Sequence, residues 1–284
     1  YVKTFKETGL KLEIMKKSKL KKEKMNLILA VNSGSKNEPY LLTLKWLPLK
    51  NKKPVVLLGK GVTFDSGGMN LKFGDFTDMK TDMTGAAAVF ALLRFCALNK
   101  IKKNVIALIP LVENMINEKA HRPGDVIKSH SGKNVEITNT DAEGRLILAD
   151  ALSYSTKLKP CCLIDIATLT GQAGSIFDKL SVVVLGNNKS LIKKYEDCGK
   201  EMNEKVWELP LWSEFRKNLD SNIADIQNSS KSSAGVINAA MFLQEFVPPK
   251  VDWMHVDIAG VSYNKQSGAT GYSILSLYDL LTKI

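Results

Sequence analysis

The sequence is poor in cysteine, histidine and arginine, and it contains no long uninterrupted hydrophobic run. Because no apolar stretch reaches roughly 18 residues, the sequence predicts no membrane-spanning helix. The cysteines show neither CxxC spacing nor the framework of a small secreted domain. We therefore expect buried, reduced thiols and a cytoplasmic protein. The four cysteines are Cys96, Cys161, Cys162 and Cys198.

Arginine is scarce although the chain is strongly basic. The 284 residues carry a formal net charge of +11, but only four of the 40 basic residues are arginines. Proteins that read nucleic acid typically use arginine for bidentate contacts, whereas the lysines here gather in runs such as 16–24 and 50–53. A solvated, lysine-rich surface is the favoured interpretation, and a DNA-binding regulator is kept as an alternative.

Hydrophobic residues make up 44% of the chain, which is enough for a large core and excludes disorder. Short apolar runs of strand character alternate with longer helical patterns. This alternation predicts a single domain over 1–284 with a three-layer α/β/α fold and a mixed, largely parallel central sheet. The predicted strands are 27–31, 41–47, 55–58, 105–112, 162–168, 182–185 and 254–258. The predicted helices are 85–98, 146–158, 192–204, 234–246 and 274–282.

Three polar segments lie at the ends of these predicted elements. Residues 59–68 (GKGVTFDSGG) follow the strand 55–58, while 78–82 (DMKTD) and 139–145 (NTDAEGR) each precede a helix. The first segment differs from a Walker loop, which needs Lys-Ser/Thr after its last glycine. Its glycines would allow the backbone to approach a bound group closely.

The third segment has two interpretations. Thr140 and Glu143 fit the S/T-x-x-E pattern of a helix capping box, which would be a structural role. In extended backbone, by contrast, Asp141, Glu143 and Arg145 would share one face, so that two carboxylates and a guanidinium converge. The spacing alone leaves both interpretations open.

Together the segments would bring four carboxylates to one place, those of Asp65, Asp82, Asp141 and Glu143. Such a cluster is strongly unfavourable in a partly buried cleft without counter-charge, and two divalent cations would neutralise it. The three histidines lie outside these segments, which favours an oxygen-rich site. Two metal ions roughly 3.5 Å apart can activate a bridging water and polarise a carbonyl or phosphoryl oxygen.

At this point a family resemblance appears. Residues 139–146 (NTDAEGRL) are similar to the signature octapeptide of the leucine aminopeptidase family, which comprises cytosolic dinuclear-zinc peptidases, and 59–68 resemble that family's first metal loop. The segments MKTDMTGAAAV, DIATLTG, SSAGVINAAMFLQEF and DIAG also look like family segments in the same order. The resemblance covers the family's C-terminal catalytic domain, from about Tyr1 to Ile284.

The resemblance implies a set of metal ligands and two further catalytic residues. Lys72 would hold the scissile carbonyl oxygen or its developing oxyanion. Arg145 would hold a bicarbonate ion that shuttles a proton, with a salt-bridged structural role as the alternative. The implied metal ligands are Lys60 as a neutral amine, Asp65, Asp82, Asp141 and Glu143.

The resemblance also implies the substrate and the assembly. The free α-amine of a peptide would bind one metal, which restricts hydrolysis to the N-terminal peptide bond. The first side chain, leucine-like or otherwise neutral, would meet Met79, Thr168 and Gly171, and the main chain at Leu169 would hold the substrate. For Met79, ordinary packing is the alternative. We expect two divalent ions per chain, Zn²⁺ first and Mn²⁺, Mg²⁺ or Co²⁺ at the looser site, in a cytoplasmic homo-hexamer without membrane partners.

Two departures from the family are visible. The family usually carries a separate N-terminal domain, which we do not expect within residues 1–284, and this bears on the hexamer contacts. The interval from Lys72 to Asp82 is also one residue shorter than in the mammalian enzyme, so the loop 73–77 is expected to alter the pocket. The main rival function is a dinuclear phosphohydrolase, which would need more basic groups near the carboxylates than Lys72 and Arg145 provide.

Overall fold

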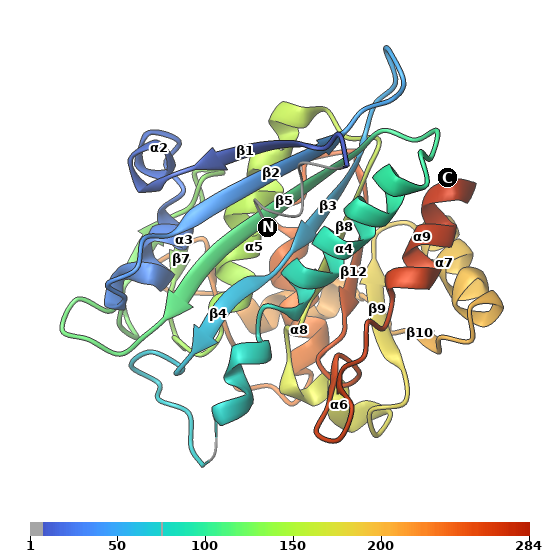
Figure 1. Ribbon diagram of the computed structural model, residues 1–284. Coiled ribbons are helices and arrows are strands. Elements are labelled where there is room, and N and C mark those ends of the chain that lie inside the picture. The colour runs from blue at the N-terminus through green and yellow to red at the C-terminus, as the bar shows by residue number, and fades with distance from the viewer. Residues whose placement is uncertain (1–7, 75) are drawn as a thin grey trace.

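A twisted central sheet runs through the computed structural model, which describes residues 8–74 and 76–284 (Figure 1). Its strands are β1 (Lys11–Met15), β2 (Tyr40–Trp46), β3 (Val55–Gly59), β4 (Gly61–Asp65), β5 (Val105–Asn114), β8 (Cys162–Ala167), β9 (Val182–Gly186), β10 (Val206–Glu208) and β12 (Asp252–Asp257). They are ordered β1-β2-β5-β3-β8-β12-β9-β10, with β4 beside β5. The middle strands β5, β3, β8 and β12 are parallel, whereas β1–β2, β2–β5 and β9–β12 are antiparallel pairs. The expected mixed, largely parallel sheet is confirmed.

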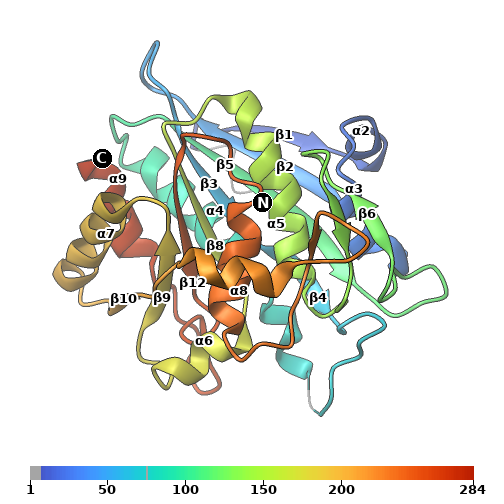
Figure 2. The ribbon, with the colours of Figure 1, turned by 180° about the vertical axis from the view of Figure 1, so that it is seen from behind.

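Helices cover both faces of this sheet. One face carries α4 (Thr84–Leu98), α7 (Lys189–Glu201) and α9 (Ile274–Lys283), in front in Figure 1. The opposite face carries α3 (Asn26–Val31), α5 (Glu143–Tyr154) and α8 (Gly235–Gln244), in front in Figure 2. Because both faces are covered, β3 consists of consecutive buried residues (VVLLG). The three-layer arrangement is thus confirmed.

Shorter elements complete the fold. A small sheet of β6 (Val126–Lys128), β7 (Asn134–Glu136) and β11 (Ile226–Gln227) stands apart from the central one, and β13 (Tyr263–Asn264) pairs with β14 (Gly268–Ala269). The remaining helical segments are α2 (Lys17–Lys22), α6 (Gly171–Ile176), η1 (Asn32–Gly34), η2 (Thr77–Thr81), η3 (Ser155–Leu158) and η4 (Ser213–Leu219).

One helical stretch in the described part of the chain, Thr77–Leu98, is long and apolar enough to cross a membrane by length and composition. It comprises η2 and α4, which are separated by Asp82 and Met83. Half of its most apolar window is buried inside the protein, and its Leu92 and Leu93 belong to the core that includes β3 and β5. These features are those of a core helix.

The expected strand at 27–31 is wrong, because these residues lie in the helix α3. Five consecutive apolar residues fit a strand or a buried helix equally well. The carboxylate of Asp150, which is distant in the sequence, stabilises the helix. Its Oδ2 accepts hydrogen bonds from the main-chain N–H groups of Leu27 (2.9 Å) and Ile28 (3.1 Å) in the first turn of α3. The strands β1 and β4 were not expected.

The cysteines are all free. Three of them are buried as expected, but Cys161 is exposed. It lies in the loop that leads into β8, one residue before the strand begins. The expectation of a buried thiol is therefore wrong for this residue.

Candidate metal centre

The carboxyl ends of the parallel strands carry the first pair of predicted site residues. Lys60 lies between β3 and β4, and its main chain is fixed by hydrogen bonds to Ile166 of β8 (Lys60 N to Ile166 O, 3.1 Å) and from Ala86 of α4 (Ala86 N to Lys60 O, 2.8 Å). Asp65 is the last residue of β4. Both side chains are buried. The loop that follows Asp65 turns at Gly67 (φ +89°), where a Cβ would lie 2.4 Å from Asn70 O.

Asp82 reaches the same place from the start of α4. Its Oδ1 accepts hydrogen bonds from Lys60 Nζ (2.7 Å) and from Thr168 Oγ1 (2.8 Å), just beyond the end of β8. The carbonyl oxygen of Thr168 accepts a further hydrogen bond from Lys60 Nζ at 2.9 Å. The loop after β8 thus holds both partners of this ion pair.

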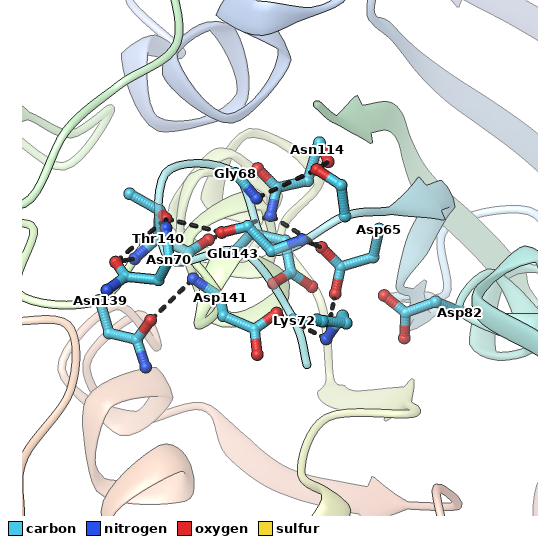
Figure 3. Close-up of polar contacts among 12 residues, drawn as sticks. Asp65, Gly68, Asn70, Lys72, Asp82, Asn114, Asn139, Thr140, Asp141 and Glu143 are labelled. Carbon is cyan, nitrogen blue, oxygen red and sulfur yellow. Dashed lines mark hydrogen bonds and ion pairs between the residues drawn. The ribbon is translucent and has the colours of Figure 1, made fainter. Parts of the chain in front are cut away.

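The segment 139–145 is neither uniformly extended nor capped as a capping box. Asp141 lies in a turn and Glu143 is the first residue of α5, whose N-cap shows no side-chain cap hydrogen bond. Instead, Thr140 Oγ1 donates to Gly67 O (2.6 Å) and accepts from Asn70 N (2.8 Å), so it ties this segment to the loop after β4. Asp141 and Glu143 nevertheless point into one site with Asp65 (Figure 3).

Two lysines balance part of this negative charge. Lys60 Nζ lies 2.7 Å from Asp82 Oδ1 and 2.9 Å from Glu143 Oε1. Lys72 Nζ lies 2.7 Å from Asp65 Oδ2 and 2.5 Å from Asp141 Oδ1. Burial opposes the charge on both lysines, but the adjacent carboxylates outweigh it and raise each pKa above its ordinary value.

Two of the acids hold their protons more tightly than usual. Burial raises the pKa of Asp82 to about 8, with Lys60 opposing the shift and the Glu143 carboxylate adding to it. Burial also raises the pKa of Asp141 to about 6, against the effect of Lys72. The local supply of positive charge is therefore insufficient for all four carboxylates.

The residues fit a divalent-cation site. Asp65, Asp141 and Glu143 each offer an oxygen, and these oxygens lie within 4.8 Å of one another. Asp82 Oδ2 and Glu143 Oε2 are buried without a hydrogen-bond donor among the described residues, which is costly unless a cation or another donor approaches. The four acids outnumber the two lysines, so the lysines cannot neutralise all four once every acid is ionised. Carboxylate oxygens are suitable ligands for hard and borderline divalent ions.

Gly144 shapes the approach of Lys60 to this centre. A Cβ at this position would lie 2.5 Å from Lys60 Cε and 2.9 Å from Lys60 Nζ. Only a glycine leaves room for the lysine to cross the first turn of α5 and reach both Asp82 and Glu143.

Arg145 lies buried one position further along α5. Its Nη1 donates to the carbonyl oxygen of Asn228 (2.8 Å), while its Nε has no hydrogen-bond partner among the described residues. Burial lowers the pKa of this guanidinium to about 10, against the fields of Glu143 and Asp257. The charges of Glu143 and Asp257 act on Arg145, but no ion pair joins it to a carboxylate of the described ranges.

The predicted pocket residues are spread over two places. Met79, in η2, lines a cavity of about 720 Å³ that also touches Lys72 and Asp141. Thr168 contacts Asp82, and the N–H of Leu169 donates to Asp257 Oδ1 at 3.2 Å. Gly171 begins α6 at the surface and does not line that cavity. The loop 73–77 borders the same cavity through Phe73 and Phe76, with residue 75 outside the described residues.

Three further buried polar residues, which were not predicted from the sequence, hold the site together. Asn114 donates to Asp65 and to Thr140, and Asn228 holds the segment 138–142 through both atoms of its amide. Asp257 accepts hydrogen bonds from the N–H groups of Leu169 and Thr170. Their polar character at the ends of apolar strands was the available signal for Asn114 and Asp257.

The fold and this site together define an α/β protein with a carboxylate-rich centre suited to divalent cations. A family model described as "Cytosol aminopeptidase family, catalytic domain" matches residues 1–278. The chain belongs to the cytosol aminopeptidase family, as the resemblance indicated.

Curated relatives agree with this assignment. A probable cytosol aminopeptidase of Geobacter sp. (strain M21) is 43% identical over 283 residues, covering 97% of this chain and 57% of the relative. One from Phytoplasma australiense is 44% identical over 283 residues, covering 96% of this chain and 57% of the relative. One from Methylobacillus flagellatus is 43% identical over 277 residues, covering 96% of this chain and 56% of the relative. The chain therefore spans a little over half the length of these relatives.

Proposed function

We propose that this chain is a metal-dependent aminopeptidase that hydrolyses the N-terminal peptide bond of peptides with leucine-like or other neutral first residues. The observation that carries the proposal is the buried group of carboxylates on Asp65, Asp82, Asp141 and Glu143, whose lysine partners leave two buried oxygens without donors. Membership of the cytosol aminopeptidase family supports the reaction type.

Five residues would hold two divalent cations, with Zn²⁺ the first expectation. Such ions supply Lewis-acid polarisation of a carbonyl and lower the pKa of a water. Lys60 would act as a neutral amine there, although in the metal-free protein the surrounding carboxylates favour its charged form. The proposed ligands are Lys60, Asp65, Asp82, Asp141 and Glu143.

Lys72 and Arg145 have different surroundings, which supports different roles. The Lys72 side chain is 21% exposed and stands at the border of the cavity, so its ammonium can donate to a substrate carbonyl oxygen as negative charge develops there. Arg145 is buried, and its Nε has no partner among the described residues. That free donor suits a small anion such as bicarbonate.

The cavity beside the carboxylates supports the preference for neutral side chains. Its lining combines the polar residues Asn70, Lys72, Asn139 and Asp141 with five apolar side chains, those of Met69, Leu71, Phe73, Phe76 and Met79. Apolar walls favour an apolar ligand group because its burial removes it from water. A larger cavity of about 810 Å³ near Trp207 has none of the four carboxylates in its lining.

The decisive test compares three chromogenic substrates. The purified chain is stripped with a chelator and reloaded with Zn²⁺ or Mn²⁺. We expect release of p-nitroaniline from leucine p-nitroanilide only after reloading, and none from the N-acetylated substrate, which lacks a free α-amine. Equal cleavage of the acetylated substrate would argue against an aminopeptidase. If p-nitrophenol were released from p-nitrophenyl phosphate faster than p-nitroaniline from leucine p-nitroanilide, the phosphohydrolase would be favoured instead.

The assembly and the compartment are proposed from the family alone. We expect a cytoplasmic homo-hexamer, because the relatives are named cytosol aminopeptidases and the resemblance implies six subunits. Sedimentation equilibrium distinguishes a hexamer from a monomer of 31.4 kDa.

A further inference from the structure

Asn114 occupies a special place between the two loops that carry the carboxylates. It is the last residue of β5 and lies directly opposite Asp65 in the parallel pairing of β4 with β5. Its side chain is fully buried, and its Nδ2 donates to Asp65 Oδ1 at 2.8 Å and to the carbonyl oxygen of Thr140 at 3.0 Å (Figure 3). One amide group thus touches the loop after β4 and the segment before α5.

The chemistry of its neighbours fixes the orientation of this amide. Asp65 Oδ1 and Thr140 O are both acceptors, so the NH₂ end of the Asn114 side chain must face them. The main-chain carbonyl of Asn114 is held as well, because it accepts hydrogen bonds from Ser66 N (2.9 Å) and Ser66 Oγ (2.8 Å). Hydrogen bonds therefore hold both the main chain and the side chain of Asn114 in place.

This contact determines which oxygen of Asp65 faces the centre. Asp65 Oδ1 accepts two hydrogen bonds, from Asn114 Nδ2 and from Gly67 N (2.9 Å). The other oxygen, Oδ2, is directed to Lys72 Nζ at 2.7 Å. A carboxylate held in this way cannot rotate without losing both N–H donors.

The contacts of Asn114 differ in kind from those of the lysines. Lys60 and Lys72 bind oxygens that point into the centre, and these contacts compete with any cation that binds there. Asn114 binds the outer oxygen of Asp65 and a main-chain oxygen of Thr140, next to Asp141 in the chain. Its contacts are compatible with an occupied centre.

We propose that Asn114 is a positioning residue that holds the Asp65 and Asp141 carboxylates at the separation needed to bind a divalent cation. The inference rests on the metal site of the proposed function. Groups that orient metal ligands from outside typically change metal affinity by about 10–100-fold when they are replaced.

The chain offers a matched control at the other end of the same strand. Asn104 immediately precedes β5, is also buried, and also holds a neighbouring loop through its amide: Oδ1 accepts from Leu49 N (2.9 Å), and Nδ2 donates to Leu49 O and Lys52 O (both 2.8 Å). The Asn114 amide, by contrast, bonds only through Nδ2, because its Oδ1 has no hydrogen-bond donor among the described residues. The loss of Asn104 should therefore weaken the fold at least as much as the loss of Asn114, without affecting the carboxylates.

The experiment measures Zn²⁺ affinity by competition calorimetry for the parent chain and for Asn114→Ala, Asn114→Asp, Asn104→Ala and Asn104→Asp. We expect both Asn114 variants to bind Zn²⁺ about 10–100-fold more weakly than the parent, and both Asn104 variants to match the parent. Asn114→Asp is informative because it adds a negative charge. If charge alone governed affinity, this variant would bind more tightly than the parent.

Urea unfolding of the metal-free proteins provides the second readout and shows that each variant is folded. Similar midpoints for Asn114→Ala and Asn104→Ala, with weaker Zn²⁺ binding only in the former, would support the positioning role. Parental Zn²⁺ affinity in Asn114→Ala, tighter binding in Asn114→Asp, or an equal loss in Asn104→Ala would overturn it. If the parent chain itself bound no cation, the proposed function would fail first, and this inference with it.

Discussion

Two groups of buried carboxylates in this protein differ in how their oxygens are satisfied. Asp150, Asp165 and Asp257 lie in the core with every side-chain oxygen accepting at least one hydrogen bond. In the candidate centre, Asp82 Oδ2 and Glu143 Oε2 have no donor in the part of the chain that the structure describes, although they are equally inaccessible to water. Burial alone therefore does not distinguish a functional acid from a structural one. An oxygen left without a donor does set Asp82 and Glu143 apart from the structural group. Asp65, whose two oxygens both have partners, lacks this sign although it lies in the centre.

The helix α5 contains one member of each group. Glu143 starts the helix and points into the centre with Lys60, whereas Asp150, two turns later, accepts N–H groups of α3 and the N–H of His130 (2.8 Å). The same helix thus supplies Asp150, whose oxygens all accept hydrogen bonds from the protein, and Glu143, whose Oε2 accepts none from the described residues. Predictions about these two residues test the comparison directly.

Glu143→Gln should show the largest effect. The substitution keeps the shape of the side chain but removes the charge of a proposed metal ligand, so we expect kcat for leucine p-nitroanilide to fall at least ~10³-fold, equivalent to about 4 kcal/mol. Circular dichroism and the unfolding midpoint should stay close to those of the parent. Near-parental turnover together with parental metal content would remove Glu143 from the ligand set and weaken the comparison.

Lys72→Met should follow, with a loss in kcat of ~10²–10³-fold, because one donor to the developing oxyanion disappears. Steady-state kinetics on the Zn²⁺-loaded chain provides the measurement. Lys80→Met is a suitable control, since Lys80 is an exposed lysine of the nearby η2. Equal losses in both variants would indicate a general effect of charge rather than a contact with substrate.

Asp150→Asn should act on stability and leave the chemistry intact. An amide can accept through only one oxygen, so at least one of the three N–H donors of Asp150 would face an NH₂ group. We expect the free energy of unfolding at pH 7 to fall by ~1–3 kcal/mol in urea titrations. Turnover per folded molecule should be unchanged, and a stable but inactive variant would contradict the division into two groups.

The sequence was sufficient for the layers of the fold but not for every element. Runs such as 105–112 are apolar at nearly every position, and this pattern is typical of a strand covered on both faces. The run 27–31 carries the same signal, yet Asp150, more than a hundred residues away, stabilises it as a helix. Local patterns cannot reveal a cap supplied from another element.

In the site, too, local sequence patterns predicted some residues, whereas contacts between distant segments could not be predicted. The carboxylates were found because polar residues follow buried strands and because their motifs match a family. Asn114 was not found, although it also is a polar residue at the end of an apolar strand. Its polar character does not show which atoms it binds, and one of its partners is the main-chain oxygen of Thr140. Such a contact depends on the tertiary arrangement of two loops and leaves no pattern in the sequence.

Histidines extend the comparison to groups that titrate near neutral pH. His255 Nδ1 lies 2.5 Å from Asp165 Oδ1, and although burial opposes its charge, this carboxylate raises its pKa. His121 is also buried, and burial lowers its pKa to about 4, with Asp125 only partly opposing the shift. The charged form of His255 is thus stabilised by an adjacent carboxylate, whereas little offsets the cost of burying a charge on His121.

His121 should produce the smallest effect, a loss of stability in acid. Because its pKa is lower in the folded chain than in the unfolded chain, its neutral form stabilises the fold above about pH 6.5, and this contribution is lost as the pH falls toward about 4. We expect the difference in unfolding free energy between the parent and His121→Leu to shift by roughly 1–2 kcal/mol in favour of the variant between pH 7 and pH 5. A pH-independent difference would show that His121 accepts a proton in the folded protein, and that burial without a full partner is tolerated here.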